Sequence, residues 1–72
     1  MSVGSRIRAR REELGLSQER LGEAAGLHRV TIVNIEAGES RPNVDTLVRL
    51  AQALGVQPGA LLDEPAPSEG AA

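Results

Sequence analysis

The 72-residue chain contains no cysteine and no aromatic residue, and all eight of its basic residues are arginine. Without cysteine, it can form neither a disulfide framework nor a thiolate zinc site. Without aromatic rings, it lacks the stacking surfaces on which many proteins bind single-stranded nucleic acid. The sequence also contains no apolar run of about 18 residues, so we expect neither a membrane span nor a secretory signal. A chain of this length corresponds to one small domain.

The charge distribution argues against a broad electrostatic attraction to a polyanion. The formal net charge is −2, but three of the acidic residues, Asp63, Glu64 and Glu69, lie near the C-terminus. Residues 1–62 hold eight arginines against seven acidic residues, a balance of +1. Four arginines crowd the N-terminal region, at positions 6, 8, 10 and 11. Binding to nucleic acid would therefore depend on local contacts more than on a wide positive field, and a solvated helix face remains the simpler interpretation of this cluster.

Capping residues and apolar spacing predict five helices and no strand. Ser5, Ser17 and Asn43 can each accept a hydrogen bond from the first turn of a following helix, and glycines can end the helices. The expected helices cover residues 6–14, 18–25, 28–37, 44–54 and 58–62. Residues 65–72 show no apolar periodicity, so we expect a folded domain over 1–64 followed by a disordered tail. The alternative is that this segment begins a linker to a further domain.

The segment from residue 17 to residue 36 has the spacing of two short helices joined by a tight turn at Gly26. Apolar side chains recur at helical spacing on both sides of this turn. Two small residues, Gly22 and Ala25, lie where two crossing helices must approach closely. This arrangement is typical of a helix-turn-helix, whose second helix enters the major groove of duplex DNA.

The chain resembles, over roughly residues 5–62, the family of phage lambda repressor and Cro, also called the xenobiotic-response-element family of bacterial regulators. The resemblance is carried by Leu-Ser-Gln-Glu-Arg-Leu at residues 16–21 and by Ala-Gly-Leu at residues 25–27. Ile-Glu-Ala-Gly at 35–38, Arg-Pro at 41–42 and the apolar segment 47–56 follow in that family's order. The resemblance implies an all-α, compact five-helix DNA-binding domain that needs no cofactor.

The helix expected at 28–37 should present its exposed side chains to DNA when its isoleucines face the core. An arginine such as Arg29 can bind guanine O6 and N7, asparagine can pair with adenine, and Val30 can contact a thymine methyl group. The resemblance supports Arg29, Val30 and Asn34 as base contacts, and Val33 lies on the same face. A solvated charge at Arg29, or valines that pack on a neighbouring helix or a partner, remain open alternatives.

Phosphate contacts are expected where helices begin, because backbone N–H groups there have no partner within the helix. The resemblance implies that Gln18 binds a phosphate and steadies the recognition helix. For Ser17, helix capping alone is the simpler role, although it can also reach a phosphate. The other candidates for phosphate contacts are His28, Thr31, Arg41, Asn43 and Arg10.

Glu36 requires a different role, since a carboxylate beside DNA would repel phosphate. The resemblance pairs Glu36 with Arg11 on the first helix, which would fix that helix to the third. An exposed pair, which would contribute under about 1 kcal/mol, is the alternative.

Catalysis and metal binding are not expected from this sequence. His28 is the single histidine, and there is no cysteine to complete a metal site or a nucleophile–base pair. Glu12 and Glu13 are adjacent on a helix, so their carboxylates cannot face one reacting atom.

We therefore expect a cytoplasmic, nucleoid-associated transcriptional regulator that binds double-stranded DNA. A repressor is the expected kind, because occupying a promoter needs no further domain. Two copies should act together at least on DNA, and four apolar residues are candidates for their contact: Val44, Val48, Val56 and Leu62. The alternatives are an antitoxin or a phage or plasmid control protein with a protein partner, and a protein-interaction module that has lost DNA binding.

Overall fold

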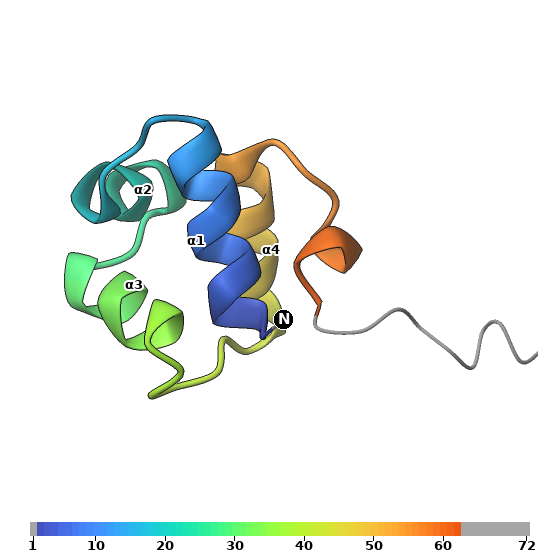
Figure 1. Cartoon of the computed structure of the whole chain (residues 1–72). Helices are drawn as coiled ribbons and strands as arrows, with labels where there is room; N and C mark the ends of the chain where they lie inside the picture. The colour runs from blue at the N-terminus through green and yellow to red at the C-terminus, as the bar shows by residue number, and fades with distance from the viewer. Residues whose placement is uncertain (1, 63–72) are drawn as a thin grey trace, which may run out of the picture.

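The computed structural model describes residues 2–62 and is all-helical over that range. It contains α1 (Val3–Glu13), α2 (Gln18–Ala25), α3 (Arg29–Glu36), α4 (Val44–Leu54) and η1 (Pro58–Leu61). In Figure 1, α2 and α3 lie to one side of α1 and α4, and η1 lies on the opposite side. The expected all-α class is confirmed. The tail expected at residues 65–72 lies outside the described residues.

The prediction of five helices is slightly off, because the described residues form four α-helices and the fifth element, η1, is a short 3-10 helix. Pro58 lies at its start, where the fixed proline backbone suits the first turn of a helix. Gly59 follows, and glycine is a poor helix former, so the segment makes one tight turn that buries Leu61.

Each α-helix is preceded by a cap residue whose side chain accepts a hydrogen bond from a backbone N–H of the first turn. Ser17 Oγ accepts from Arg20 and Asn43 Oδ1 accepts from Thr46, as the sequence predicted for these two caps. The prediction of Ser5 as the cap of α1 is wrong. Ser2 is the cap, and the N–H of Ser5 donates to its hydroxyl at 3.1 Å, so α1 begins at Val3.

The core lies between the α1–α4 pair and the α2–α3 pair and receives side chains from every helix. Its members are Ile7, Leu21, Ala25, Ile32, Ile35, Leu50, Ala51, Leu54 and Leu61. No described polar or charged residue falls among those fully buried. No helix in the described part of the chain is long and apolar enough to cross a membrane.

Two glycines allow backbones to approach more closely than any side chain would permit. A Cβ atom on Gly4 would collide with the carbonyl oxygen of Ile35, so α1 contacts the C-terminal end of α3 through its backbone. A Cβ atom on Gly22 would lie 2.7 Å from the carbonyl oxygen of Leu27. Gly22 therefore serves the close approach of α2 to the turn, which accounts for a glycine inside a helix.

Candidate nucleic-acid interface

The turn between α2 and α3 depends on the left-handed backbone of Gly26, which has a φ of 71°. This conformation, which side chains disfavour, ends α2 and turns the chain at once toward α3. The N–H of Leu27 then donates to the carbonyl oxygen of Gly22 at 2.8 Å, which closes the turn. The two helices pack together on one side of the molecule (Figure 1).

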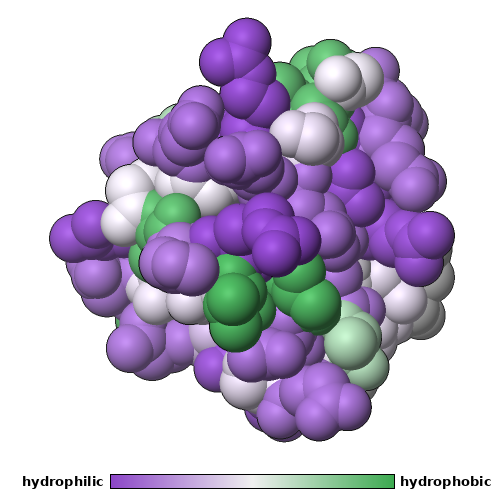
Figure 2. Space-filling model, turned by 90° about the vertical axis from the view of Figure 1, so that its left-hand side faces the viewer, coloured by the Kyte–Doolittle hydropathy of each residue, from purple (hydrophilic) through white to green (hydrophobic). Residues whose placement is uncertain are grey.

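The outward face of α3 carries the residues that the sequence predicted as base contacts. Ile32 and Ile35 are buried, so the opposite side of the helix points to solvent. Arg29 and Asn34 are exposed, Val30 is 49% exposed, and Val33 is half-buried. Figure 2 views the molecule from the side of α2 and α3 and shows hydrophobic surface interrupted by strongly hydrophilic side chains. A helix in the major groove can use such side chains for hydrogen bonds to base edges and for contact with the thymine methyl group.

Arg11 and Glu36 form the ion pair that the resemblance implied. Arg11 Nε lies 2.7 Å from Glu36 Oε2, and Arg11 Nη2 lies 3.0 Å from Glu36 Oε1. The side chains are only 11% and 4% exposed, so this is a nearly buried, two-point contact. The hydrogen bond with Glu36 raises the pKa of Arg11 above its ordinary value, whereas burial acts in the opposite direction. The pair joins α1 to the end of α3.

The same guanidinium also fixes the segment before α2. Arg11 Nη1 donates to the carbonyl oxygen of Leu16 at 2.8 Å, and Gln18 Nε2 donates to Glu36 Oε1 at 3.1 Å. The bond between Gln18 and Glu36 was not predicted, because the sequence shows only a polar residue at the start of a helix. An amide group carries two hydrogens, so a Gln18 held by Glu36 retains one donor for a ligand.

The other phosphate candidates occupy several environments. Ser17 and Asn43 are exposed caps of α2 and α4, Thr31 is half-buried on α3, and Arg41 is exposed in the loop between α3 and α4. His28 was expected to start the third helix, but it is the cap residue before Arg29. Its Nδ1 atom accepts a hydrogen bond from the N–H of Val30 at 3.1 Å, a role that was not predicted.

Arg10 has a contact that the sequence did not reveal. Its Nε donates to the carbonyl oxygen of Leu54 at 3.0 Å, and its Nη1 donates to Glu13 at 3.0 Å. Arg10 therefore satisfies a carbonyl at the C-terminal end of α4, where helical carbonyl groups lack partners within the helix. The phosphate contact of Arg10 stays a prediction.

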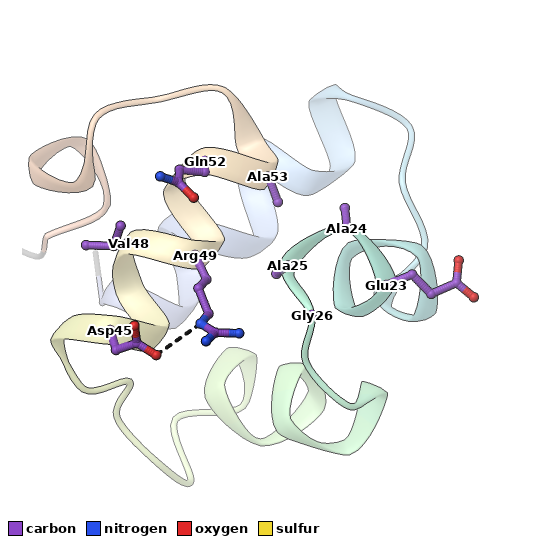
Figure 3. A pocket seen from close by; sticks show the side chains of 9 residues that line it. All are labelled: Glu23, Ala24, Ala25, Gly26, Asp45, Val48, Arg49, Gln52 and Ala53. Atoms are coloured by element: carbon purple, nitrogen blue, oxygen red, sulfur yellow. Dashed lines mark hydrogen bonds and ion pairs between the residues drawn. The ribbon is translucent and has the colours of Figure 1, made fainter.

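The four candidates for a contact between copies differ in exposure. Val44 is 78% exposed and Leu62 is 45% exposed, whereas Val48 and Val56 are half-buried. Val56 packs against the core, so its side chain is largely used within the domain. Val48 lines a shallow groove between the end of α2 and α4 (Figure 3).

No group of three or more histidine, cysteine, aspartate or glutamate side chains that could hold a metal ion occurs within residues 2–62.

Comparison with known proteins places this arrangement in a family. The chain matches the helix-turn-helix family over residues 7–61. It is 42% identical over 64 residues to the immunity repressor protein of Bacillus phage phi105, covering 89% of this chain and 44% of that protein. It spans less than half the length of this relative and of a similar helix-turn-helix regulator from Sinorhizobium medicae.

Solved structures show the same likeness. The P22 c2 repressor in complex with a synthetic operator has a TM-score of 0.83 and 40% identity, covering 88% of this chain and 96% of that chain. The restriction-modification controller protein C.AhdI from Aeromonas hydrophila has a TM-score of 0.81 and 35% identity, covering 83% and 91% of the two chains. The resemblance seen in the sequence is confirmed, and the chain belongs to the helix-turn-helix family.

Proposed function

We propose that this domain binds duplex DNA at specific sequences and acts as the DNA-binding part of a transcriptional repressor. The observation that carries the proposal is the outward face of α3, where Arg29, Val30 and Asn34 are exposed together while the isoleucines of α3 are buried. The likeness to the P22 c2 repressor, which was solved with a synthetic operator, supports this assignment. Such a protein works in the cytoplasm, on the nucleoid.

Three side chains of α3 read the bases in this proposal. Arg29 donates two hydrogen bonds to guanine O6 and N7, and Asn34 pairs with the N6 and N7 atoms of adenine. Val30 contacts the methyl group of thymine. Val33 is half-buried and supplies a smaller apolar contact on the same face.

The DNA backbone is bound by residues that surround α3. Gln18 donates its remaining amide hydrogen to a phosphate, while its bond to Glu36 holds the side chain in place. Arg41 contacts a phosphate from the loop after α3, and Ser17, Thr31 and Asn43 supply further polar contacts. These contacts fix the position of the domain but carry no sequence information.

Two copies bind one near-palindromic site in this proposal. About three base-reading side chains discriminate too little against genomic DNA, and a two-fold pair doubles the readout. The contact between the copies includes the exposed residues Val44 and Leu62, with Val48 and Val56 beside them. Sedimentation with and without the selected site tests this pairing. A one-to-one complex on a site without symmetry would contradict it.

The DNA-binding proposal is tested with sites selected from random duplex DNA. Arg29→Ala should lower affinity for the best site by about 1–3 kcal/mol and relax the preference at one base pair. Arg41→Ala should weaken all sequences alike and lower the salt slope by about one unit. Arg49→Ala, which removes an exposed arginine of α4, is the matched control for charge.

Two outcomes would refute the assignment. Equal, sequence-independent losses in Arg29→Ala and Arg41→Ala would show that α3 does not read bases. The absence of duplex binding at tens of micromolar protein in about 50 mM salt would favour a protein-interaction module instead.

A further inference from the structure

The helix that is proposed to read DNA begins at a different kind of residue from the other α-helices. Serine or asparagine caps α1, α2 and α4, through Ser2, Ser17 and Asn43. His28 caps α3, through a hydrogen bond of 3.1 Å from the N–H of Val30 to Nδ1. Hydroxyl and amide groups do not titrate near neutral pH, whereas an imidazole does. Among the α-helices of residues 2–62, only α3 therefore has a cap that a proton can switch.

The hydrogen bond determines which form of the imidazole is present. A backbone N–H can only donate, so Nδ1 must offer a lone pair and carry no proton. The neutral ring then has its hydrogen on Nε2. A protonated imidazole donates from both nitrogens and accepts nothing, so it cannot cap the helix.

We propose that His28 is a positioning residue of the DNA interface, which holds the first turn of α3 in its neutral form and releases that turn when protonated. The cap and the proposed base contacts are close together in the chain. Val30 supplies the N–H that His28 accepts and also carries a proposed base-reading side chain, and Arg29 lies between His28 and Val30. The consequence for DNA rests on the proposed function, but the capping role does not.

A positive charge on His28 would lie close to other positive charge on α3. Protonation would place a cation at the N-terminal end of α3, which is the positive end of the helix dipole. The following residue, Arg29, is also cationic. On α2, which packs against α3, the charged residues are Glu19, Arg20 and Glu23, and Arg20 is paired with Glu23 at 3.7 Å.

Within residues 2–62, no carboxylate forms an ion pair with the imidazole. On α1, Arg11 meets α3 at its other end, through Glu36. Loss of the acceptor and the added charge therefore act in the same direction, and both destabilise the first turn.

The first test measures which nitrogen of the imidazole carries the hydrogen. His28 is the only histidine in the chain, so the side-chain nitrogen signals of a ¹⁵N-labelled sample belong to it without further assignment. At a pH of about 8, where an imidazole is neutral, we expect an unprotonated Nδ1 and a protonated Nε2. A dominant form with the hydrogen on Nδ1 would overturn the proposal.

The second test compares the pH dependence of stability with that of a matched variant. His28→Asn keeps a strong helix cap that does not titrate, and it retains every carboxylate and the terminal amine. Protonation of the ring removes the acceptor that caps α3, so the proposal expects acid to favour unfolding relative to His28→Asn. Between pH values of about 8 and 5.5, the folded-to-unfolded ratio of the unchanged chain should fall two- to tenfold relative to His28→Asn.

Urea unfolding followed by circular dichroism measures this ratio, since the chain has no aromatic residue for fluorescence. Equal responses of the two proteins to pH would overturn the proposal.

The third test concerns DNA. At a pH of about 7.5, His28→Ala should bind the selected duplex about fivefold more weakly, and His28→Asn should recover most of that loss. An affinity that rises in acid for the unchanged chain alone would mean that His28 acts as a cation on phosphate, which overturns the positioning role. If the unchanged chain binds no duplex, the proposed function fails, and the first two tests still decide the capping role.

Discussion

The two ends of α3 are held by contacts of different strength. At the C-terminal end, the Glu36 carboxylate is nearly buried and accepts hydrogen bonds from Arg11 and Gln18, and the backbone of Gly4 packs against the last turn. At the N-terminal end, one hydrogen bond to the exposed ring of His28 caps the helix. The helix is thus anchored most firmly at the end opposite Arg29 and Val30. Substitutions in the contacts at the C-terminal end should therefore mainly affect stability, whereas substitution of Val30 near the N-terminal end should mainly affect DNA binding.

The largest effect on stability is expected at the anchored end. Glu36→Leu leaves the guanidinium of Arg11 nearly buried without its carboxylate, which should lower the free energy of unfolding by up to about 3 kcal/mol. Arg11→Met combined with Glu36→Leu removes both charges and should recover much of this loss. Urea unfolding of the single and double variants gives the interaction energy. Purely additive losses would contradict a coupled pair.

The sign of the Arg11 pKa shift predicts how this pair responds to pH. The pKa of Arg11 is raised on folding, so the stability that it contributes is present below the unfolded pKa and is lost only as pH rises through the folded pKa. That window lies in strong alkali. Any change of stability between pH values of about 5.5 and 8 must therefore come from groups other than Arg11, which separates its effect from that of His28.

A smaller loss is expected where α1 contacts the end of α3. Gly4→Ala would improve helix propensity by about 1 kcal/mol if space were available. However, the new Cβ atom meets the carbonyl oxygen of Ile35, so we expect a net loss of about 1–3 kcal/mol. Gly59→Ala is the control, since no heavy atom outside its own chain neighbours lies within 4 Å of the added Cβ. A Gly4→Ala variant that is more stable than the control would show that α1 can shift.

The sequence predicted those features that depend on a few neighbouring residues. Ser17 and Gly26 bound α2, and Asn43 and Gly55 bound α4, so the limits of both helices follow from local capping. The start of α1 was misplaced because two serines, three residues apart, can each act as a cap. In the structure Ser2 is the cap, and Gly4 in the first turn packs on the end of α3.

Contacts between residues far apart in the sequence were either implied by the resemblance or not predicted. The pairing of Arg11 with Glu36 came from the resemblance, and nothing local in the sequence indicates it. The bond between Arg10 and the carbonyl oxygen of Leu54 joins residues 44 positions apart, so no local pattern predicts it. The arginines near the N-terminus look alike in the sequence, and the fold gives Arg10 and Arg11 different distant partners.

At the exposed end, Val30→Ala should change DNA binding without a large effect on stability. Loss of a methyl contact with thymine should lower affinity by about 1 kcal/mol. Replacing thymine with deoxyuridine in the selected site removes the same methyl group from the DNA, so it should weaken the unchanged chain and leave Val30→Ala unaffected. Equal losses in both proteins would mean that another residue contacts that methyl group. Val33→Ala should have a smaller effect, because Val33 is half-buried.

The smallest effect on stability is expected at the ion pair between Arg49 and Asp45. Its distance is close to that of the pair between Arg11 and Glu36, but its side chains are far more exposed. Arg49 Nε lies 3.0 Å from Asp45 Oδ2, close to the 2.7 Å of the pair between Arg11 and Glu36. The side chains of Arg49 and Asp45 are 50% and 74% exposed, so water and salt screen their attraction.

Arg49→Gln keeps the part of the side chain near the backbone in the groove of Figure 3 and replaces the charged guanidinium with a neutral amide. We expect it to change the free energy of unfolding by less than about 0.5 kcal/mol, and by less still at high salt. The measurement is urea unfolding at two salt concentrations, beside Glu36→Leu. A loss as large as that of Glu36→Leu would show that the distance between the charged groups, and not their burial, determines what an ion pair contributes in this domain.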